Sequence, residues 1–269
     1  MTTSRSTWPR LGGAVALLAC VAGAVFVLWP TAPSKSAERY VAPHEAALPD
    51  PVEPAFRVPD PKPLRRDPYA SRWAPVLRSV TALAHPGGGL ARAVLDKTTP
   101  EGTTNIAAVL GSATDSLGRL WAHVRLATLP NNLTGWVPRD ALGGYATVRT
   151  HLVIDRDRLT ATLYRGKRPI FRADVGIGRA AAPTPAGEFY VRNKLTEFSN
   201  PAYGPVAFGT SARSDVLTDW PAGGFIGIHG TDEPELLPGR VSHGCIRLRN
   251  EDILRLARLM PVGTPLTIR

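Results

Sequence analysis

The chain has 269 residues, of which 43% are hydrophobic and 20% charged, so it can build one large globular domain or two smaller ones. Its formal net charge of +10 predicts an anionic neighbour, namely nucleic acid, acidic lipid or an anionic cell-wall polymer. No helix-turn-helix, zinc-finger or aromatic RNA-binding signature accompanies the charge, and we therefore expect no nucleic-acid partner.

An apolar segment without charged residues runs over residues 11–29. As a helix, a segment of this length spans roughly 30 Å, the thickness of the hydrocarbon core of a membrane. Arg5 and Arg10 precede it, and because positive residues stay on the cytoplasmic side, residues 1–10 are expected to form a cytoplasmic tail. The sequence thus predicts a single-pass transmembrane anchor in the cell membrane, with the rest of the chain outside the cytoplasm. The alternatives are a cleaved signal peptide and a lipoprotein signal at Leu17-Leu18-Ala19-Cys20, although apolar residues follow Cys20 where polar ones are expected.

Residues 30–75 contain eleven prolines among charged and small residues. Such a composition buries too little apolar surface to offset the entropy lost on ordering. We expect a disordered, Pro-rich stalk, extended by stretches of polyproline II.

A small β domain is predicted over residues 78–143, where short apolar runs alternate with turn residues. The runs are Ala91–Leu95, Ile106–Leu110, Leu120–Leu126 and Trp136–Pro138. The segment Gly135-Trp136-Val137-Pro138 resembles the closing strand of a bacterial Src-homology-3-like β-barrel, a module that either binds cell wall or acts as a spacer. Trp121 and Trp136 are expected in its core.

Residues 147–269 are predicted to form a second, mostly β domain, with a turn at Asp155-Arg156-Asp157. The Gly- and Pro-rich stretch 201–209 is expected to be a loop. Tyr203 and Trp220 fall in loops where they can rim a groove, although ordinary packing is favoured. The expected strands cover residues 148–154, 159–164, 170–175, 187–193 and 265–268.

One helix is expected near the C-terminus. Asn250 is predicted to be its N-cap, and Glu251 and Asp252 suit the positive end of the helix dipole. Pro261 and Gly263 end the helix. The side chains expected to face the core are Ile253, Leu254, Leu256, Ala257 and Met260. The whole chain is therefore predicted to be mainly β, with one flanking helix.

Two histidines and a cysteine occur together late in the chain. A cysteine thiolate is activated by a nearby imidazole that takes its proton, and His229 and His243 both precede Cys245. If Ser242–Leu248 is extended, His243 and Cys245 lie on the same face of a strand. Gly244 leaves the other face bare, so the amides of Gly244 and Cys245 can donate to an oxyanion.

The other cysteine, Cys20, lies in the predicted anchor and cannot form a disulfide with Cys245. A single free thiol is unusual in an exported protein, which favours a chemical role for it. The alternatives are an inert buried thiol and a zinc site. Because the sequence shows neither an obvious fourth ligand nor paired cysteines, we predict no metal and no cofactor.

The block Ser242-His243-Gly244-Cys245, preceded by His229, resembles the signature of the L,D-transpeptidase catalytic domain family (YkuD type). The resemblance covers residues 147–269. It includes Thr184-Pro185-Ala186-Gly187-Glu188-Phe189, which is similar to the family's Thr-Pro-x-Gly-x-Phe segment. The sequence departs from the pattern in two places. Only twelve residues separate His229 from Ser242, and Arg247 stands where many members carry Asn.

This resemblance implies a β-sandwich enzyme that acts on peptidoglycan stem peptides. Cys245 would be the nucleophile and His229 the general base, while His243 would be the alternative base or an orienting and oxyanion-supporting residue. Arg247 is expected on the same face as Cys245, where its partner is either a stem carboxylate or a buried group of the protein itself. The residues implied to contact substrate or oxyanion are Gly244, Ser242, Gly230 and Arg247. An acyl-enzyme formed with a stem tetrapeptide would be resolved by the side-chain amine of a neighbouring diamino acid, which cross-links the wall.

Three other functions fit the same residues. An L,D-carboxypeptidase would resolve the acyl-enzyme with water, and a protein-attaching enzyme would use a protein lysine as the acceptor. A non-catalytic cell-wall-binding protein would tolerate replacement of Cys245.

Overall fold

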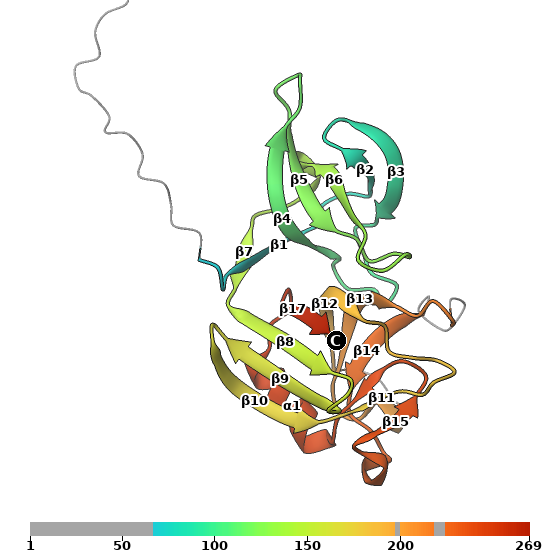
Figure 1. Cartoon of the computed structure of the whole chain (residues 1–269). Coiled ribbons are helices and arrows are strands. Elements are labelled where there is room, and N and C mark those ends of the chain that lie inside the picture. Colours follow the sequence, from blue (N-terminus) through green and yellow to red (C-terminus); the bar gives the residue numbers. More distant parts are fainter. Residues whose placement is uncertain (1–66, 197–199, 218–223) are drawn as a thin grey trace, which may run out of the picture. The chain divides into compact units, whose positions relative to one another are not determined.

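The computed structural model describes residues 67–196, 200–217 and 224–269. The predicted cytoplasmic tail, the predicted anchor at 11–29 and most of the predicted stalk lie outside these residues. Within the described ranges no helix is both long and apolar enough to span a membrane. Lys62–Arg269 form one compact unit, and its described part contains two β-sheets (Figure 1).

The first sheet has seven strands in the order β3-β2-β6-β5-β4-β1-β7. All neighbouring strands in it are antiparallel. The strands are β1 (Ser71–Pro75), β2 (Val80–His85), β3 (Gly88–Leu95), β4 (Ile106–Thr114), β5 (Leu120–Arg125), β6 (Thr134–Pro138) and β7 (Ala146–Val148). The four apolar runs expected in this region fall in β3, β4, β5 and β6. The prediction that Trp121 is buried is confirmed, since it is 6% exposed, whereas Trp136 is half-buried and stacks on His123.

This sheet extends beyond the predicted small domain at both ends. Ser71–Pro75 belongs to the predicted disordered stalk, yet it forms β1, between β4 and β7. Two flanking strands satisfy its backbone, and Trp73 packs against Gly263 so closely that a Cβ there would lie 2.0 Å from the indole. Amino-acid composition cannot predict these contacts, because they are made with residues far away in the sequence. The resemblance of this sheet to a Src-homology-3-like barrel stays a prediction.

The second sheet has ten strands in the order β10-β9-β8-β17-β12-β13-β14-β16-β11-β15. Its first strands are β8 (Thr150–Asp155), β9 (Thr160–Arg165), β10 (Arg168–Asp174), β11 (Gly176–Gly178) and β12 (Gly187–Leu195). The remaining strands are β13 (Ala207–Arg213), β14 (Phe225–His229), β15 (Gly239–Ser242), β16 (Ile246–Arg247) and β17 (Pro265–Ile268).

Strand β12 turns this sheet into a β-sandwich. Its residues Gly187–Tyr190 pair with β17, whereas Val191–Leu195 pair with β13, so one strand belongs to both layers. The apolar core lies between the layers and includes fully buried Leu152, Leu163, Phe208, Ile228 and Leu266. The mainly β fold with a C-terminal sandwich is therefore as predicted.

The prediction of a loop at 201–209 is wrong in its second half. A 3-10 helix covers Pro201–Tyr203, and β13 begins at Ala207. Gly209 lies inside β13 because it leaves room for the side chain of Asn193, whose Oδ1 accepts a hydrogen bond from the Gly209 amide at 2.9 Å. A Cβ at Gly209 would lie 2.3 Å from that oxygen.

The single α-helix of the described residues, α1, covers Asn250–Leu259 and flanks β10 (Figure 1). The predicted N-cap is off by one residue, because Arg249 is the N-cap and Asn250 is the first helical residue. The Asn250 carboxamide instead accepts a hydrogen bond from the Thr231 amide at 3.0 Å. Ile253 and Leu256 are buried as expected, whereas Leu254 is 41% exposed.

Candidate active site

Two neighbouring strands bring the predicted catalytic residues together. β14 and β16 are parallel, with Ile228 opposite Ile246 and His229 opposite Arg247. His229 is the last residue of β14, and Cys245 directly precedes β16. Residues far apart in sequence thus lie on adjacent strands at one edge of a pocket of about 290 Å³.

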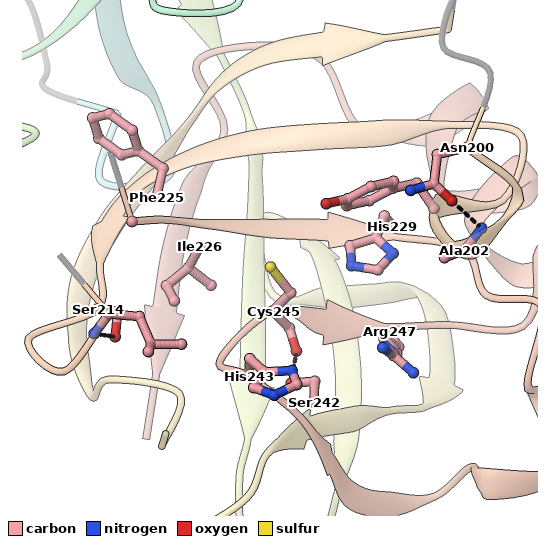
Figure 2. Close-up of a pocket in the computed structure, with 13 residues that line it drawn as sticks. Asn200, Ala202, Ser214, Phe225, Ile226, His229, Ser242, His243, Cys245 and Arg247 are labelled. Atoms are coloured by element: carbon pink, nitrogen blue, oxygen red, sulfur yellow. Dashed lines mark hydrogen bonds between the residues drawn. The ribbon is translucent and has the colours of Figure 1, made fainter. Parts of the chain in front are cut away.

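The pocket has two distinct ends. Figure 2 shows Cys245 between His229 on one side and Phe225 on the other. Its lining comprises Asn200, Ala202, Tyr203, Ser214, Leu217, Gly224, Phe225, Ile226, His229, Ser242, His243, Cys245 and Arg247.

A tight turn presents Cys245 to this pocket. Gly244 has φ +119°, a conformation that favours glycine, and a Cβ there would lie 2.9 Å from Ile226 Cδ1. Ser242 Oγ accepts a hydrogen bond from the Gly244 amide at 3.1 Å and donates one to the Cys245 carbonyl at 2.6 Å. The condition that Ser242–Leu248 is extended is therefore not met, since β15 ends at Ser242 and β16 begins at Ile246. His243 is exposed, while Cys245 is half-buried.

The side chain of Thr184 fixes the same turn from behind. Its buried hydroxyl accepts a hydrogen bond from the Gly178 amide at 2.8 Å and donates one to the Gly244 carbonyl at 2.7 Å. The sequence alone indicates no chemical role for Thr184 or Pro185. The structure gives its threonine a role, which is to hold the backbone beside Cys245.

The Cys245 sulfur accepts a hydrogen bond from the Gly227 amide at 3.3 Å. Burial raises the pKa of Cys245 above its ordinary value, and the Gly227 hydrogen bond and the positive charge of Arg247 oppose that shift. The resting form of the group is therefore the neutral thiol, which needs a base before it can attack.

The imidazole of His229 is oriented by its own neighbourhood. Its Nδ1 lies 2.6 Å from the Gly230 carbonyl oxygen, so this nitrogen carries the proton and Nε2 is left as the acceptor. The ring of Tyr203 meets the imidazole edge-on, with centroids 4.8 Å apart. Burial lowers the pKa of His229 to about 4, with a further contribution from Arg247 and an opposing one from the Gly230 hydrogen bond. His229 is therefore neutral at pH 7 and able to accept a proton.

Gly227 leaves open space between the two groups. A Cβ at this position would lie 3.7 Å from Cys245 Sγ and 3.7 Å from His229 Cδ2, the ring atom bonded to Nε2. The thiol and the accepting side of the imidazole therefore border the same small space. The geometry suits a proton transfer from Sγ to Nε2.

The remaining predicted residues take different places. Arg179 donates a hydrogen bond to Nε2 of His243. Arg247 pairs with Glu233 at 2.8 Å, and its Nε is buried without a hydrogen-bond partner in the described structure. Gly230 is buried behind His229, where a Cβ would lie 2.2 Å from Asn250 Oδ1, so its position favours orienting His229 over the predicted substrate contact.

Sequence reasoning did not single out three contributors to this site. Thr184 could have been found only from the resemblance, because it lies in the segment that is similar to the family's Thr-Pro-x-Gly-x-Phe segment. Tyr203 was expected either at the rim of a groove or, preferably, in ordinary packing; it lines the pocket and contacts the imidazole. Gly227 carries no side chain and therefore no chemical signal, and only the pairing of β14 with β16 shows its importance. Among the described residues, no group of three or more His, Cys, Asp or Glu side chains is placed to hold a metal ion.

Known proteins match the C-terminal part of the chain in sequence. Residues 149–268 match the family model of the L,D-transpeptidase catalytic domain (YkuD). YkuD of Bacillus subtilis (strain 168), an L,D-transpeptidase by its name, is 31% identical over 122 residues, which cover 45% of this chain and 67% of that protein. YbiS of Escherichia coli (strain K12), also named as an L,D-transpeptidase, is 31% identical over 140 residues, or 44% of each chain.

Solved structures with the same family name are also similar. The catalytic domain of the Enterococcus faecium L,D-transpeptidase is 26% identical, with a TM-score of 0.35, over 45% of this chain and 96% of that one. An L,D-transpeptidase from Mycobacterium smegmatis is 15% identical, with a TM-score of 0.37, over 71% of this chain and 94% of that one. The assignment rests on the sequence relatives, two of which match over two thirds of their length. The chain belongs to the L,D-transpeptidase family of acyl-transferring enzymes, with its catalytic domain in the C-terminal β-sandwich.

Proposed function

We propose that this protein is a peptidoglycan L,D-transpeptidase with Cys245 as its nucleophile. The observation that carries the proposal is the pair formed by the Cys245 thiol and the His229 imidazole, which border one space beside Gly227 in an open pocket. Membership of the family supports an acyl transfer. A thiol beside a neutral base supports a reaction that passes through a covalent acyl-enzyme.

The first half-reaction forms a thioester. His229 Nε2 takes the proton of the Cys245 thiol, and the sulfur attacks the carbonyl carbon before the terminal D-alanine of a stem tetrapeptide. The C–N bond breaks, His229 returns the proton to the departing amine, and D-alanine leaves. The leaving group must therefore lie on the His229 side of Cys245.

The second half-reaction transfers the acyl group. An acceptor amine enters on the side that D-alanine has left, His229 removes its proton, and the nitrogen attacks the thioester carbon. The C–S bond breaks, and the thiolate recovers the proton from His229. Water in place of the amine would give L,D-carboxypeptidase chemistry with the same residues.

Backbone amides stabilise the tetrahedral oxyanion in this proposal. The Gly244 amide donates to Ser242 Oγ in the structure, so the Cys245 amide is the better candidate of the predicted pair. Thr184 and Ser242 act as positioning residues for this backbone, because both bond to the turn at Gly244 and Cys245.

The proposed place of action is the cell wall outside the cytoplasmic membrane. The uncharged segment 11–29 would anchor the chain, and the Pro-rich stalk would carry the enzyme towards the wall. Both parts lie outside the described residues, and the support for them is the sequence alone.

The test is a mass spectrum of products formed by the full-length chain, purified in detergent, from a disaccharide-tetrapeptide. We expect a dimer lighter than two substrate molecules by one alanine, and a thioester adduct on Cys245. Cys245→Ala should abolish both products. His229→Gln should lower the rate of thioester formation at least 100-fold, because general-base catalysis of this kind contributes about that much.

His243→Gln serves as the matched histidine control and should retain most of the activity if His229 is the base. A tripeptide without dimer would replace transpeptidation with carboxypeptidase activity. Turnover by the Cys245→Ala chain would contradict the nucleophile.

A further inference from the structure

A second cavity, of about 280 Å³, lies between the first sheet and the β-sandwich. Three arginines line it, Arg125 from β5, Arg192 from β12 and Arg213 from β13. Asp96 also lines it, and its carboxylate accepts a hydrogen bond from Ser79 Oγ at 3.0 Å. The cavity is thus a recess with an excess of positive charge.

This cavity and the catalytic pocket share one wall, the side chain of Phe225. The guanidinium carbons of Arg192 and Arg213 lie 3.7 Å and 4.8 Å from the centroid of its ring. Figure 2 places Phe225 at the end of the pocket opposite His229. The arginine-lined cavity is therefore the neighbour of the catalytic pocket at this end, on the other side of Phe225.

The arginines are not equivalent. Arg192 is structural, because its Nε donates to the Thr210 carbonyl at 2.8 Å and its Nη2 pairs with Glu101 at 3.1 Å. Arg125 is half-buried, and its guanidinium makes no ion pair or side-chain hydrogen bond within the described part of the chain. The negative charge of Glu188 favours the charged form of Arg125. Both carboxylate oxygens of Glu188 accept hydrogen bonds from the Thr267 hydroxyl, at 2.9 and 3.0 Å.

The distance from the nucleophile suits a peptide substrate. The Gly227 amide touches Cys245 Sγ at 3.3 Å, and Phe225 stands two residues before Gly227 in the same strand. Two strand residues span about 7 Å. An extended peptide covers the distance to Phe225, the wall shared with the cavity, in about two to three residues.

The direction of the substrate follows from the proton transfers. His229 protonates the leaving amine, so the leaving group lies at the His229 end and the acyl part of the donor extends towards Phe225. A partly buried cation in a recess prefers a carboxylate, since the pair forms charge-assisted hydrogen bonds.

We propose that this cavity is a donor subsite, in which Arg125 binds a carboxylate carried by the stem peptide two or three residues before the scissile bond. The subsite rests on the proposed function for its substrate, and it makes the enzyme selective for stems in which that carboxylate is free over stems in which it is amidated.

The binding test uses the full-length Cys245→Ala chain, which cannot turn over, and calorimetry with two tetrapeptides. One carries a free carboxylate at its second residue, and the other is amidated there. We expect the free-carboxylate peptide to bind about tenfold more tightly, and Arg125→Gln to remove this difference. Arg125→Lys, which keeps the charge, should restore part of it.

Arg72→Gln is the matched control, because Arg72 is an exposed arginine of β1 in the same sheet. Thermal unfolding of each variant verifies that the fold is retained. Equal binding of the two peptides by the chain with Arg125 intact, or an equal loss in Arg72→Gln, would overturn the subsite.

Thioester formation on the chain with Cys245 intact gives an independent readout. Arg125→Gln should raise KM for the free-carboxylate donor about tenfold and leave kcat unchanged, because the contact is made before and during reaction alike. If no thioester forms while the charge-dependent binding persists, the proposed reaction fails and the subsite stands.

Discussion

The chemistry of the site depends on how two side chains are buried. His229 is 4% exposed and its pKa is lowered to about 4, while burial raises the pKa of Cys245. Burial disfavours the charged form of each group, so the free enzyme holds a neutral thiol beside a neutral imidazole. In the proposed reaction the thiolate therefore forms as His229 takes the proton of the thiol.

The lowered pKa of His229 predicts a pH-dependent stability. Between pH 4 and pH 6.5 the unfolded chain binds a proton on this histidine and the folded chain does not, so its contribution is complete above pH 6.5 and is lost as pH falls towards 4. The difference of about 2.5 pKa units corresponds to about 3 kcal/mol. Urea unfolding at pH 4 and pH 7 should show it.

The comparison protein for this experiment is His229→Gln, which lacks the titrating ring. Its free energy of unfolding should fall less between pH 7 and pH 4, by about 3 kcal/mol, since all other titrating groups are common to both chains. Arg247, which lies opposite His229 on β16, is present in both proteins. Identical pH profiles for the two proteins would contradict the buried, neutral histidine.

At the scale of elements, the pairing of β14 with β16 creates the site. Parallel pairing aligns His229 with Arg247, and the turn before β16 then sets Cys245 beside Gly227. The missing side chain of Gly227 keeps the space between thiol and imidazole open. Gly227 thus borders both groups of the proposed proton transfer, although it carries no side chain.

Gly227→Ala should separate stability from catalysis. The added methyl would meet Sγ and the imidazole at 3.7 Å, an ordinary van der Waals distance, so the free energy of unfolding should change by less than about 1 kcal/mol. The methyl would fill the path of the proton, and thioester formation should fall at least tenfold. Intact mass spectrometry of the acylated chain measures that rate.

The control for this substitution is Gly111→Ala in β4, where a Cβ meets no atom within 4 Å. It should leave both stability and acylation unchanged. A Gly227→Ala chain that acylates at the original rate would show that proton transfer does not use this space.

At the scale of the whole described molecule, buried polar contacts join the first sheet to the β-sandwich. Arg192 of β12 is 3% exposed and pairs with Glu101, which also accepts a hydrogen bond from Asn193 at 3.1 Å. The hydroxyl of Tyr190 donates to the Ile106 carbonyl at 3.0 Å. β12 therefore contributes residues to the sandwich core, to the contact with the first sheet and to the lining of the arginine-lined cavity.

Glu101→Gln should destabilise the chain by on the order of 2 kcal/mol, because it leaves the buried Arg192 cation without its countercharge. Urea unfolding measures the loss, and acylation of Cys245 should persist at low temperature. Glu235→Gln, an exposed residue in the 3-10 helix Pro234–Leu236, is the control and should change stability by less than about 0.5 kcal/mol. Equal effects of the two substitutions would show that the contact between the sheets adds no stability.

Much of this protein was readable from its sequence because the signals are local. The alternation of apolar residues located β3 to β6 and five of the ten strands of the sandwich, and the helical spacing of apolar residues located α1. The block around Cys245, with His229 upstream, was enough to indicate the family, a candidate nucleophile and a candidate base, because these residue types carry their chemistry wherever they are brought together.

The tertiary structure decided what local patterns cannot encode. Strand β1 forms because β4 and β7 pair with it, and β13 continues through Gly209 because Asn193 needs the room. The turn at Gly244, held by Thr184 from a distant segment, interrupts the chain between β15 and β16. Such features arise from contacts between residues far apart in the chain. The pattern within any single stretch of sequence cannot predict the free energy of these contacts.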